Sequence, residues 1–159
     1  MTKDEFAAAV TASEKKLYIA AFSVLKNAED AKDAAADAIL YAWKHIGDLR
    51  DEKKLDAWLL SVTYSRAKMI RRKNRIRRYE SLDDYRNYFG YETDTSDVMF
   101  FDILFCAPLD DAERQILTLY FLYGYTMPEI ADMTGKKESY VKTRYYRALR
   151  KMSDTEGLI

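Results

Sequence analysis

Apolar residues recur at steps of three and four along most of this 159-residue chain, and this spacing restricts the fold more than any other feature. In the N-terminal half, three long segments carry it, at about residues 6–25, 29–45 and from residue 55 onward. Only five Gly and two Pro interrupt the chain, and 48% of its residues are hydrophobic, so long helices can form and bury a core. We therefore predict an all-α fold of two small helical domains joined by an acidic linker, with a helix-turn-helix in the C-terminal domain.

Each predicted N-terminal helix has one apolar face. The second helix is lined by alanines, which let a neighbouring helix approach closely, and we expect Trp43 to be buried beside them. Gly47 should end this helix in the left-handed conformation. The third helix, from about Leu55, should leave Tyr64 largely outside its apolar stripe. The stripe itself comprises Trp58, Leu59, Val62, Met69 and Ile70.

Charge is segregated into blocks, although the formal net charge is zero. Residues 66–78 hold eight Lys or Arg and no acid, and residues 136–151 hold seven Lys or Arg and one Glu. Residues 80–113, between these blocks, carry ten acids and one base. Two cationic blocks on a neutral chain favour two polyanion-binding surfaces. We predict domains at residues 1–79 and 96–159, with the acidic linker at 80–95.

The chain offers little for catalysis or metal binding. Cys106 lies among apolar residues and should be an inert buried thiol, and His45 has no Cys or His neighbour at ligand spacing. Because no phosphate loop or nucleophile motif is present either, we expect no enzyme activity, no metal and no cofactor. No segment reaches the roughly 18 apolar residues of a membrane span, so a cytoplasmic protein without membrane insertion is expected.

Residues 126–152, TMPEIADMTGKKESYVKTRYYRALRKM, have the pattern of a helix-turn-helix. Thr126 and Glu129 form a capping box that starts the first helix, and Gly135 should end it. In the second helix the inward residues are Val141, Tyr145, Ala148 and Met152.

The polar and basic residues that remain outside are candidates for DNA binding. Lys and Arg neutralise phosphates, Arg binds guanine with two hydrogen bonds, and Thr or Tyr contacts thymine methyls or backbone oxygens. The alternative is an ordinary solvated helix face. The predicted contact residues are Lys136, Lys137, Ser139, Tyr140, Lys142, Thr143, Tyr146 and Arg147.

Three segments together resemble the extracytoplasmic-function (ECF) sigma factors, a two-domain branch of the sigma-70 family. NAEDAKDAAADAILYAWKHI is similar to the family's Asp-rich helix ending in Ala-Trp, and LDAWLLSVTYSRAKMIRRK to its Ala-Trp-Leu helix with a basic tail. Residues 109–152 are similar to the family's promoter-reading domain. Departures are Ser65 where Asn is frequent, Lys137 at a usual Ser cap, Tyr120 for a common Arg, and Ala at 34–36 for bulkier residues.

The resemblance implies a promoter-specificity factor that binds RNA polymerase core and promoter DNA, with an anti-sigma factor as a further candidate partner. The family's contact with the clamp helices of the largest polymerase subunit implies a role for Asp33, Asp37, Leu40 and Tyr41. Its minus-ten contact implies a role for residues 48–54 and for the third helix. The residues implied there are Tyr64, Ser65, Arg66, Lys68, Met69 and Arg72.

The helix-turn-helix would bind the minus-thirty-five element, and the acidic linker would run through polymerase channels normally occupied by nucleic acid. Two other functions remain open from the sequence: a freestanding helix-turn-helix regulator that binds operators as a dimer, and a helical adaptor whose basic faces bind acidic proteins or anionic lipid.

Overall fold

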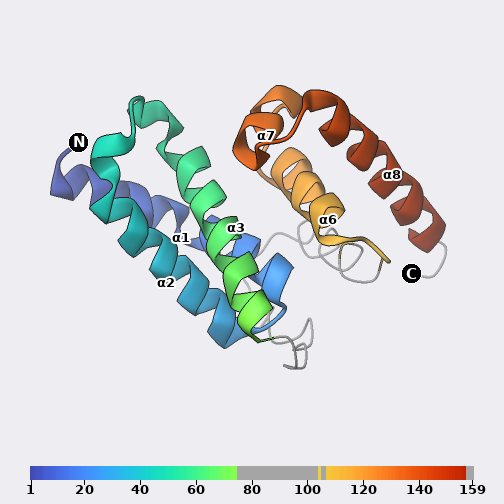
Figure 1. Cartoon of the computed structure of the whole chain (residues 1–159), viewed down its shortest axis with the longest axis horizontal. Helices are drawn as coiled ribbons and strands as arrows, with labels where there is room; N and C mark the ends of the chain where they lie inside the picture. Colours follow the sequence, from blue (N-terminus) through green and yellow to red (C-terminus); the bar gives the residue numbers. More distant parts are fainter. Residues whose placement is uncertain (75–103, 105–106, 157–159) are drawn as a thin grey trace. The chain divides into compact units, whose positions relative to one another are not determined.

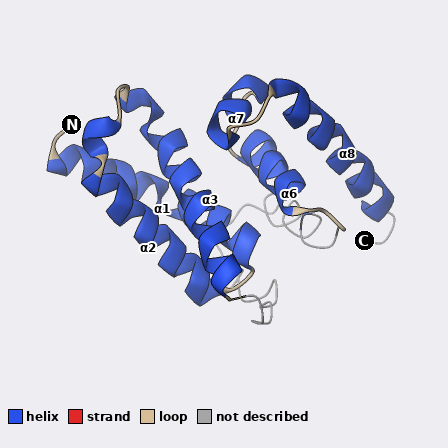
Figure 2. Cartoon of the chain, in the orientation of Figure 1, coloured by secondary structure: helices blue, strands red, loops and turns tan. Residues whose placement is uncertain are grey.

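The computed structural model describes residues 1–74, 104 and 107–156. Within these residues every regular element is helical (Figure 2), so the all-α prediction is confirmed. The chain divides into two compact units, Met1–Glu80 and Ser81–Ile159. The predicted linker at 80–95 and Cys106 lie outside the described residues, and the predicted domain boundaries stay predictions. Among the residues described, none of the helices combines the length and apolar character that a membrane span requires.

The N-terminal unit is a bundle of three long helices that pack against one another in all three pairs (Figure 1). They are α1 (Lys3–Leu25), α2 (Ala28–Lys44) and α3 (Leu55–Lys73). Two short 3₁₀ helices, η1 (Ile46–Asp48) and η2 (Glu52–Lys54), connect α2 to α3.

Local capping explains where the first two helices begin. Thr2 and Glu5 form a capping box at the start of α1, which the sequence pattern had placed slightly later. Lys26 takes the left-handed conformation with φ of 52°, and the Asn27 side chain then accepts the backbone N–H of Asp30 to begin α2. The chain therefore reverses within two residues, which sets α2 against α1.

The alanine face of α2 is buried as predicted, but the stripe on α3 is not the predicted one. Tyr64 is only 2% exposed, whereas Met69 is 39% exposed. The buried positions on α3 follow steps of four, one and three from Leu55, so this helix faces α1 and α2 at once. The predicted stripe was centred too far to one side. The buried residues of α3 are Leu55, Leu59, Leu60, Thr63, Tyr64 and Ala67.

Two further predictions about α2 are wrong. Trp43 packs against Phe6 of α1, with ring centroids 5.3 Å apart, but it is 41% exposed rather than buried. Gly47 does not end α2 in the left-handed conformation: α2 ends at Lys44, and Gly47 lies within η1 without a positive φ.

The C-terminal unit is built from shorter elements packed on one long helix. These are α6 (Asp111–Leu117), the π-helical segment η4 (Thr118–Leu122), α7 (Met127–Thr134) and α8 (Glu138–Glu156). Both α6 and α7 pack against α8. The π-helical geometry of η4 had no counterpart in the sequence analysis. Gly124 and Gly135 take the left-handed conformation, at φ of 73° and 65°, and Gly135 follows the end of α7 as predicted.

Candidate nucleic-acid and polymerase interfaces

The helix-turn-helix forms as its capping residues predict. The Thr126 Oγ1 accepts the backbone N–H of Glu129 at 3.3 Å, and Glu129 Oε1 accepts the N–H of Thr126 at 3.3 Å. After the left-handed Gly135, the N–H of Lys136 donates to the carbonyl of Ala131 at 3.0 Å and closes the turn. α8 then begins at Glu138. The turn thus leaves the N-terminal end of α8 facing solvent, as a helix that enters a DNA groove requires.

The burial pattern of α8 separates an inner from an outer face. Val141 and Ala148 are fully buried, while Tyr145 and Met152 are half-buried. Tyr140 is half-buried at the edge of the outer face. The other predicted DNA-contact residues are all exposed, namely Lys136, Lys137, Ser139, Lys142, Thr143, Tyr146 and Arg147.

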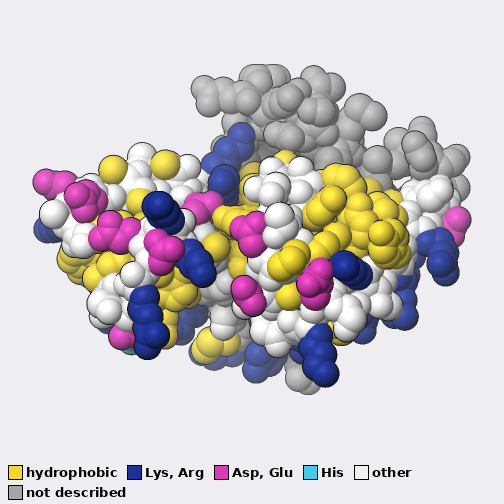
Figure 3. Space-filling view, turned by 90° about the horizontal axis from the view of Figure 1, so that it is seen from above, with side chains coloured by type: hydrophobic (Ala, Val, Ile, Leu, Met, Phe, Trp, Pro, Cys, Tyr) yellow, Lys and Arg dark blue, Asp and Glu magenta, His cyan; other side chains and the backbone are white. Residues whose placement is uncertain are grey.

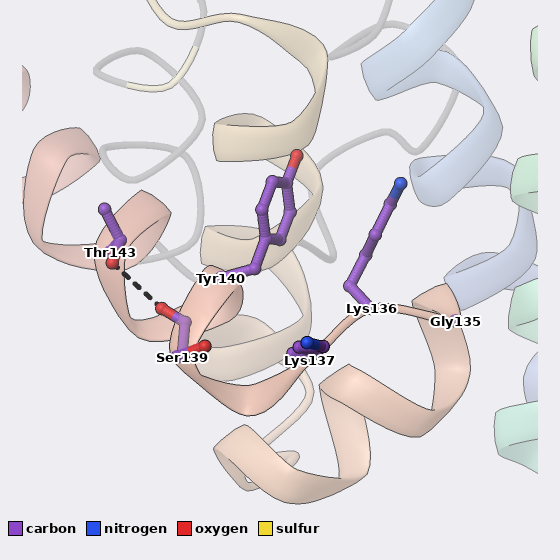
Figure 4. A pocket seen from close by; sticks show the side chains of 6 residues that line it. All are labelled: Gly135, Lys136, Lys137, Ser139, Tyr140 and Thr143. Carbon is purple, nitrogen blue, oxygen red and sulfur yellow. Dashed lines mark hydrogen bonds between the residues drawn. The ribbon is translucent and has the colours of Figure 1, made fainter.

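An open hollow of about 480 Å³ lies at the turn and the first part of α8 (Figure 4). The side chains of Lys136 and Tyr140 extend in the same direction there, with Lys136 Nζ 5.5 Å from the Tyr140 ring centroid. Thr143 Oγ1 donates to the carbonyl of Ser139 at 2.9 Å. The lining residues are Gly135, Lys136, Lys137, Ser139, Tyr140 and Thr143.

Among the predicted contact residues of α8, as far as the structure describes their surroundings, Lys142 is the cation that lies beside a carboxylate. Lys142 Nζ lies 3.1 Å from Glu138 Oε1, one turn earlier, and both side chains are about half exposed. Exposed pairs of this kind contribute about 0–1 kcal/mol, so a phosphate can displace Glu138 at little cost. Arg147 is exposed to solvent. The outer face of α8 is therefore a cationic surface rather than a set of internal ion pairs.

An aromatic cluster beside this face was missed by the sequence analysis. η4 brings Tyr120 and Phe121 against Tyr145, and Tyr145 in turn packs edge-on against Tyr146 with centroids 5.2 Å apart. Burial, the neighbouring Tyr120 and Tyr146, and a hydrogen bond with Tyr120 raise the pKa of Tyr145. Figure 3 shows hydrophobic side chains gathered into a patch on one face of the C-terminal unit. The adjacent aromatic pairs in the sequence were a signal, but only the π-helical turn brings them together.

The predicted polymerase residues share one side of α2. Asp33, Asp37 and Leu40 are exposed and Tyr41 is half-buried. An apolar groove of about 490 Å³ between α1 and α2 is lined by Leu40 and Trp43, among others, and was not predicted.

The predicted minus-ten residues on α3 do not all reach the surface. Tyr64 is buried and therefore offers no stacking surface, which corrects its assignment. Of the others, Ser65, Met69 and Arg72 are exposed, and Arg66 and Lys68 are half-buried.

Arg66 connects the two predicted interfaces of the N-terminal unit. Its Nε lies 3.6 Å from Asp37 Oδ2, and its Cζ lies 4.7 Å from the Tyr41 ring centroid. Because Asp37 is about half exposed, this contact contributes little to stability. Arg66 is thus the predicted minus-ten cation that the structure places against the predicted polymerase face.

His45 takes a structural position. Its ring stacks on Tyr41 with centroids 4.1 Å apart, and its Nδ1 lies 2.9 Å from the Tyr41 carbonyl. Among the residues that the structure describes, no cluster of three or more His, Cys, Asp or Glu side chains is arranged to hold a metal ion.

Comparisons with known proteins agree with this architecture. The family Sigma-70 region 2 matches residues 9–77, and the family Sigma-70, region 4 matches residues 109–152, which together span well over half of the chain. RNA polymerase sigma factor SigV of Bacillus subtilis (strain 168) is 29% identical over 155 residues, covering 95% of this chain and 90% of that protein.

Two solved structures share the fold. CnrH in complex with the cytosolic domain of CnrY has a TM-score of 0.71 at 23% identity, covering 99% of this chain and 90% of that one. The sigma factor RpoE in complex with the anti-sigma factor NepR from Bartonella quintana has a TM-score of 0.72 at 19% identity, covering 94% and 95%. Matches to both sigma-70 regions in one chain favour a polymerase subunit over a freestanding regulator. The chain belongs to the extracytoplasmic-function branch of the sigma-70 family of RNA polymerase sigma factors.

Proposed function

We propose that this sigma factor divides promoter recognition between its two units, with the minus-thirty-five element bound by α8 and the minus-ten element by α3. The observation that carries the proposal is the outer face of α8, which is cationic and lies beside an open hollow at a helix-turn-helix turn. The protein acts as a non-catalytic subunit in the cytoplasm, where polymerase and chromosome meet.

On duplex DNA, the N-terminal part of α8 enters the major groove. Lys136, Lys137 and Lys142 neutralise phosphates and fix the register of the helix. Arg147 neutralises a further phosphate, and Thr143 can contact a thymine methyl. Ser139, Tyr140 and Tyr146 complete the contact surface.

On the melted minus-ten strand, the exposed side of α3 supplies an apolar surface beside cations. Met69 packs against an unstacked base, and Lys68 and Arg72 neutralise the backbone. Ser65 lies on the same exposed side and contributes a hydroxyl for base contact. Residues 48–54 border the strand. Arg66 takes part once its contact with Asp37 opens.

Polymerase core binds α2 through Asp33, Asp37, Leu40 and Tyr41. Two exposed carboxylates next to an exposed leucine suit a partner helix that carries basic residues beside an apolar stripe, as we propose for the clamp helices of the largest subunit. Because the sigma factor RpoE, which shares this fold, was solved in complex with the anti-sigma factor NepR, we also propose sequestration of this chain by an anti-sigma factor.

Transcription in vitro tests the proposal. Core polymerase alone and core with this protein are compared on a genomic library, and the proposal expects new start sites only with the protein. Identical transcripts in the two reactions would contradict it.

Three variants test which surface binds DNA and which binds polymerase. Arg147→Gln and Lys142→Gln should weaken binding of holoenzyme to a promoter duplex and lower the slope of log affinity against log salt by about 0.9 for each lost phosphate contact. Leu40→Ala should weaken binding to core polymerase and leave DNA contacts unchanged. Lys15→Gln, at an exposed lysine of α1, is the matched control and should change neither quantity.

A further inference from the structure

Two cations in the basic block of α8 pair with carboxylates at the start of α6. Arg144 Nη1 lies 2.7 Å from Asp110 Oδ2, and Lys151 Nζ lies 2.7 Å from Glu113 Oε1. We call these contacts the α6–α8 ion pairs. Arg144 and Lys151 are seven residues apart, which is about two helical turns, so they lie on the same side of α8. Asp110 and Glu113 are the two members of the capping box that starts α6.

Each carboxylate therefore performs two tasks. Asp110 Oδ1 accepts the backbone N–H of Glu113 at 2.8 Å while its other oxygen takes Arg144. Glu113 Oε1 accepts the N–H of Asp110 at 3.4 Å and also binds Lys151. The hydrogen bonds that define the first turn of α6 thus also fix where α8 crosses it.

Buried neighbours add further contacts to this junction. Glu113 is fully buried, and the buried Arg114 donates to the carbonyls of Leu104 and Leu109 at 3.4 and 3.0 Å. Arg114 therefore ties Leu104 and Leu109, which precede α6, to the same turn. A carboxylate without exposure to water depends on its cationic partner, because an isolated buried charge is costly.

Arg144 also reaches the predicted DNA surface. Its Cζ lies 5.1 Å from the ring centroid of Tyr140, which lines the hollow at the start of α8. One side chain thus contacts both the N-cap of α6 and an aromatic residue of the contact surface.

We propose that Arg144 and Lys151 are positioning residues for DNA recognition, which set the angle and the axial position of α8 through Asp110 and Glu113 and do not contact phosphates themselves. This role rests on the proposed function of α8. Recognition by base edges requires placement to within about half an ångström, and the outer residues of α8 can meet that requirement only if the helix is fixed from behind. The acids of α6 then support DNA binding despite their negative charge.

The direction in which one substitution changes DNA affinity distinguishes this role from simple electrostatics. Asp110→Asn removes an acid from a DNA-binding domain, so electrostatics alone predicts equal or tighter binding. Asn is as good an N-cap as Asp, so α6 still begins correctly. The positioning role predicts the opposite result, a loss of about two- to fivefold in affinity for the specific duplex, in line with a partly exposed ion pair.

The experiment uses wild-type and variant full-length chains bound to polymerase core. The probe is a duplex enriched by the wild-type holoenzyme from a randomised pool, compared with a scrambled duplex, over a series of salt concentrations. Arg144→Gln should lower the ratio of specific to scrambled affinity without changing the salt slope, and Arg144→Lys should restore most of it. The double variant that combines Arg144→Gln with Asp110→Asn should lose no more specific affinity than either single variant, because both substitutions remove the same contact.

Arg147→Gln is the control, and it should reduce the salt slope. Equal or tighter specific binding by Asp110→Asn, or a lower salt slope for Arg144→Gln, would overturn the positioning role while leaving the function of α8 intact. If no variant, Arg147→Gln included, lost affinity for the specific duplex, that result would overturn DNA recognition by α8 and the positioning role with it. Binding is measured well below the melting temperature of each variant, determined by circular dichroism.

Discussion

The two units of this sigma factor differ in the charged side chains that they bury, which are Asp30 in the N-terminal unit and Glu113 and Arg114 in the C-terminal unit. The N-terminal unit closes its core with large apolar residues such as Phe22, Leu17 and Leu59 against the alanines of α2. The C-terminal unit buries Glu113 and Arg114 beside its apolar residues. Its α6 and α7 have only seven and eight residues, so each has little apolar surface to offer. The difference teaches that charge pairs help to orient the short α6 against α8, whereas the core between the three long helices is mainly apolar.

The largest effect is expected in the apolar core. Leu59→Ala should lower the free energy of unfolding of the N-terminal unit by about 2–5 kcal/mol, because Leu59 is fully buried and its loss leaves a cavity. Both tryptophans, Trp43 and Trp58, belong to this unit, so their fluorescence during urea unfolding reports on it alone.

The matched control is Leu40→Ala, at a leucine that is 51% exposed, and it should change the unfolding midpoint little. Equal effects at Leu40 and Leu59 would contradict the assignment of the core.

A smaller effect is expected from a buried charge in the other unit. Glu113→Gln should destabilise the C-terminal unit by about 1–3 kcal/mol, since Gln keeps the capping box but leaves Lys151 without its buried carboxylate. Far-ultraviolet circular dichroism should show the loss while tryptophan fluorescence stays unchanged. Glu129→Gln, at the equivalent but exposed capping position of α7, is the control and should be nearly neutral. Matching losses at both positions would assign the effect to the caps rather than to burial.

Glycine substitutions compare the turn of the helix-turn-helix with the connection between α2 and α3 in the N-terminal unit. Gly135→Ala should cost about 1 kcal/mol, because Gly135 has a φ of 65° and a side chain there is strained even in open space. Gly47 has no positive φ, and a Cβ meets nothing within 4 Å, so Gly47→Ala should be neutral or slightly stabilising. A thermal melt of each variant measures the difference, and a costly Gly47→Ala would reinstate the helix end predicted there from sequence.

Local signals in the sequence predicted the fold well. The capping box at Thr126 and Glu129 and the glycine at 135 involve neighbouring residues, so their geometry could be derived without knowing the rest of the chain. The burial of Tyr64 and the exposure of Trp43 could not be derived in this way. Whether an amphipathic residue faces the core depends on how many helices cover each side of its own helix, and that is a property of the packed bundle.

The candidate site was predictable to a similar degree. Periodicity placed Lys142 and Arg147 on the outer face of α8, because Val141 and Ala148 had to point inward. The link between Arg66 and Asp37 joins different helices, and no pattern within either helix predicts it. The pairing of Arg144 with Asp110 spans 34 residues and was invisible for the same reason.

The smallest expected effect is a pH dependence confined to the C-terminal unit. Partial burial acts to raise the pKa of Asp110, but the hydrogen bonds with Glu113 and the charges of Arg144 and Lys151 outweigh it and hold the pKa below the usual 3.8. Because the folded state binds the proton more weakly than the unfolded state, the stabilisation is present above the usual pKa and is lost as the pH falls through the folded pKa. Wild type should therefore melt at a higher temperature than Asp110→Asn near neutral pH, and the two curves should converge on acidification below about pH 3.8. Circular dichroism follows this difference, while tryptophan fluorescence, which reports on the N-terminal unit, should show the same melting for both proteins at every pH. A gap between wild type and Asp110→Asn that persists in acid would mean that the ionised carboxylate of Asp110 does not stabilise the junction, and that this unit is held by apolar packing like the other one.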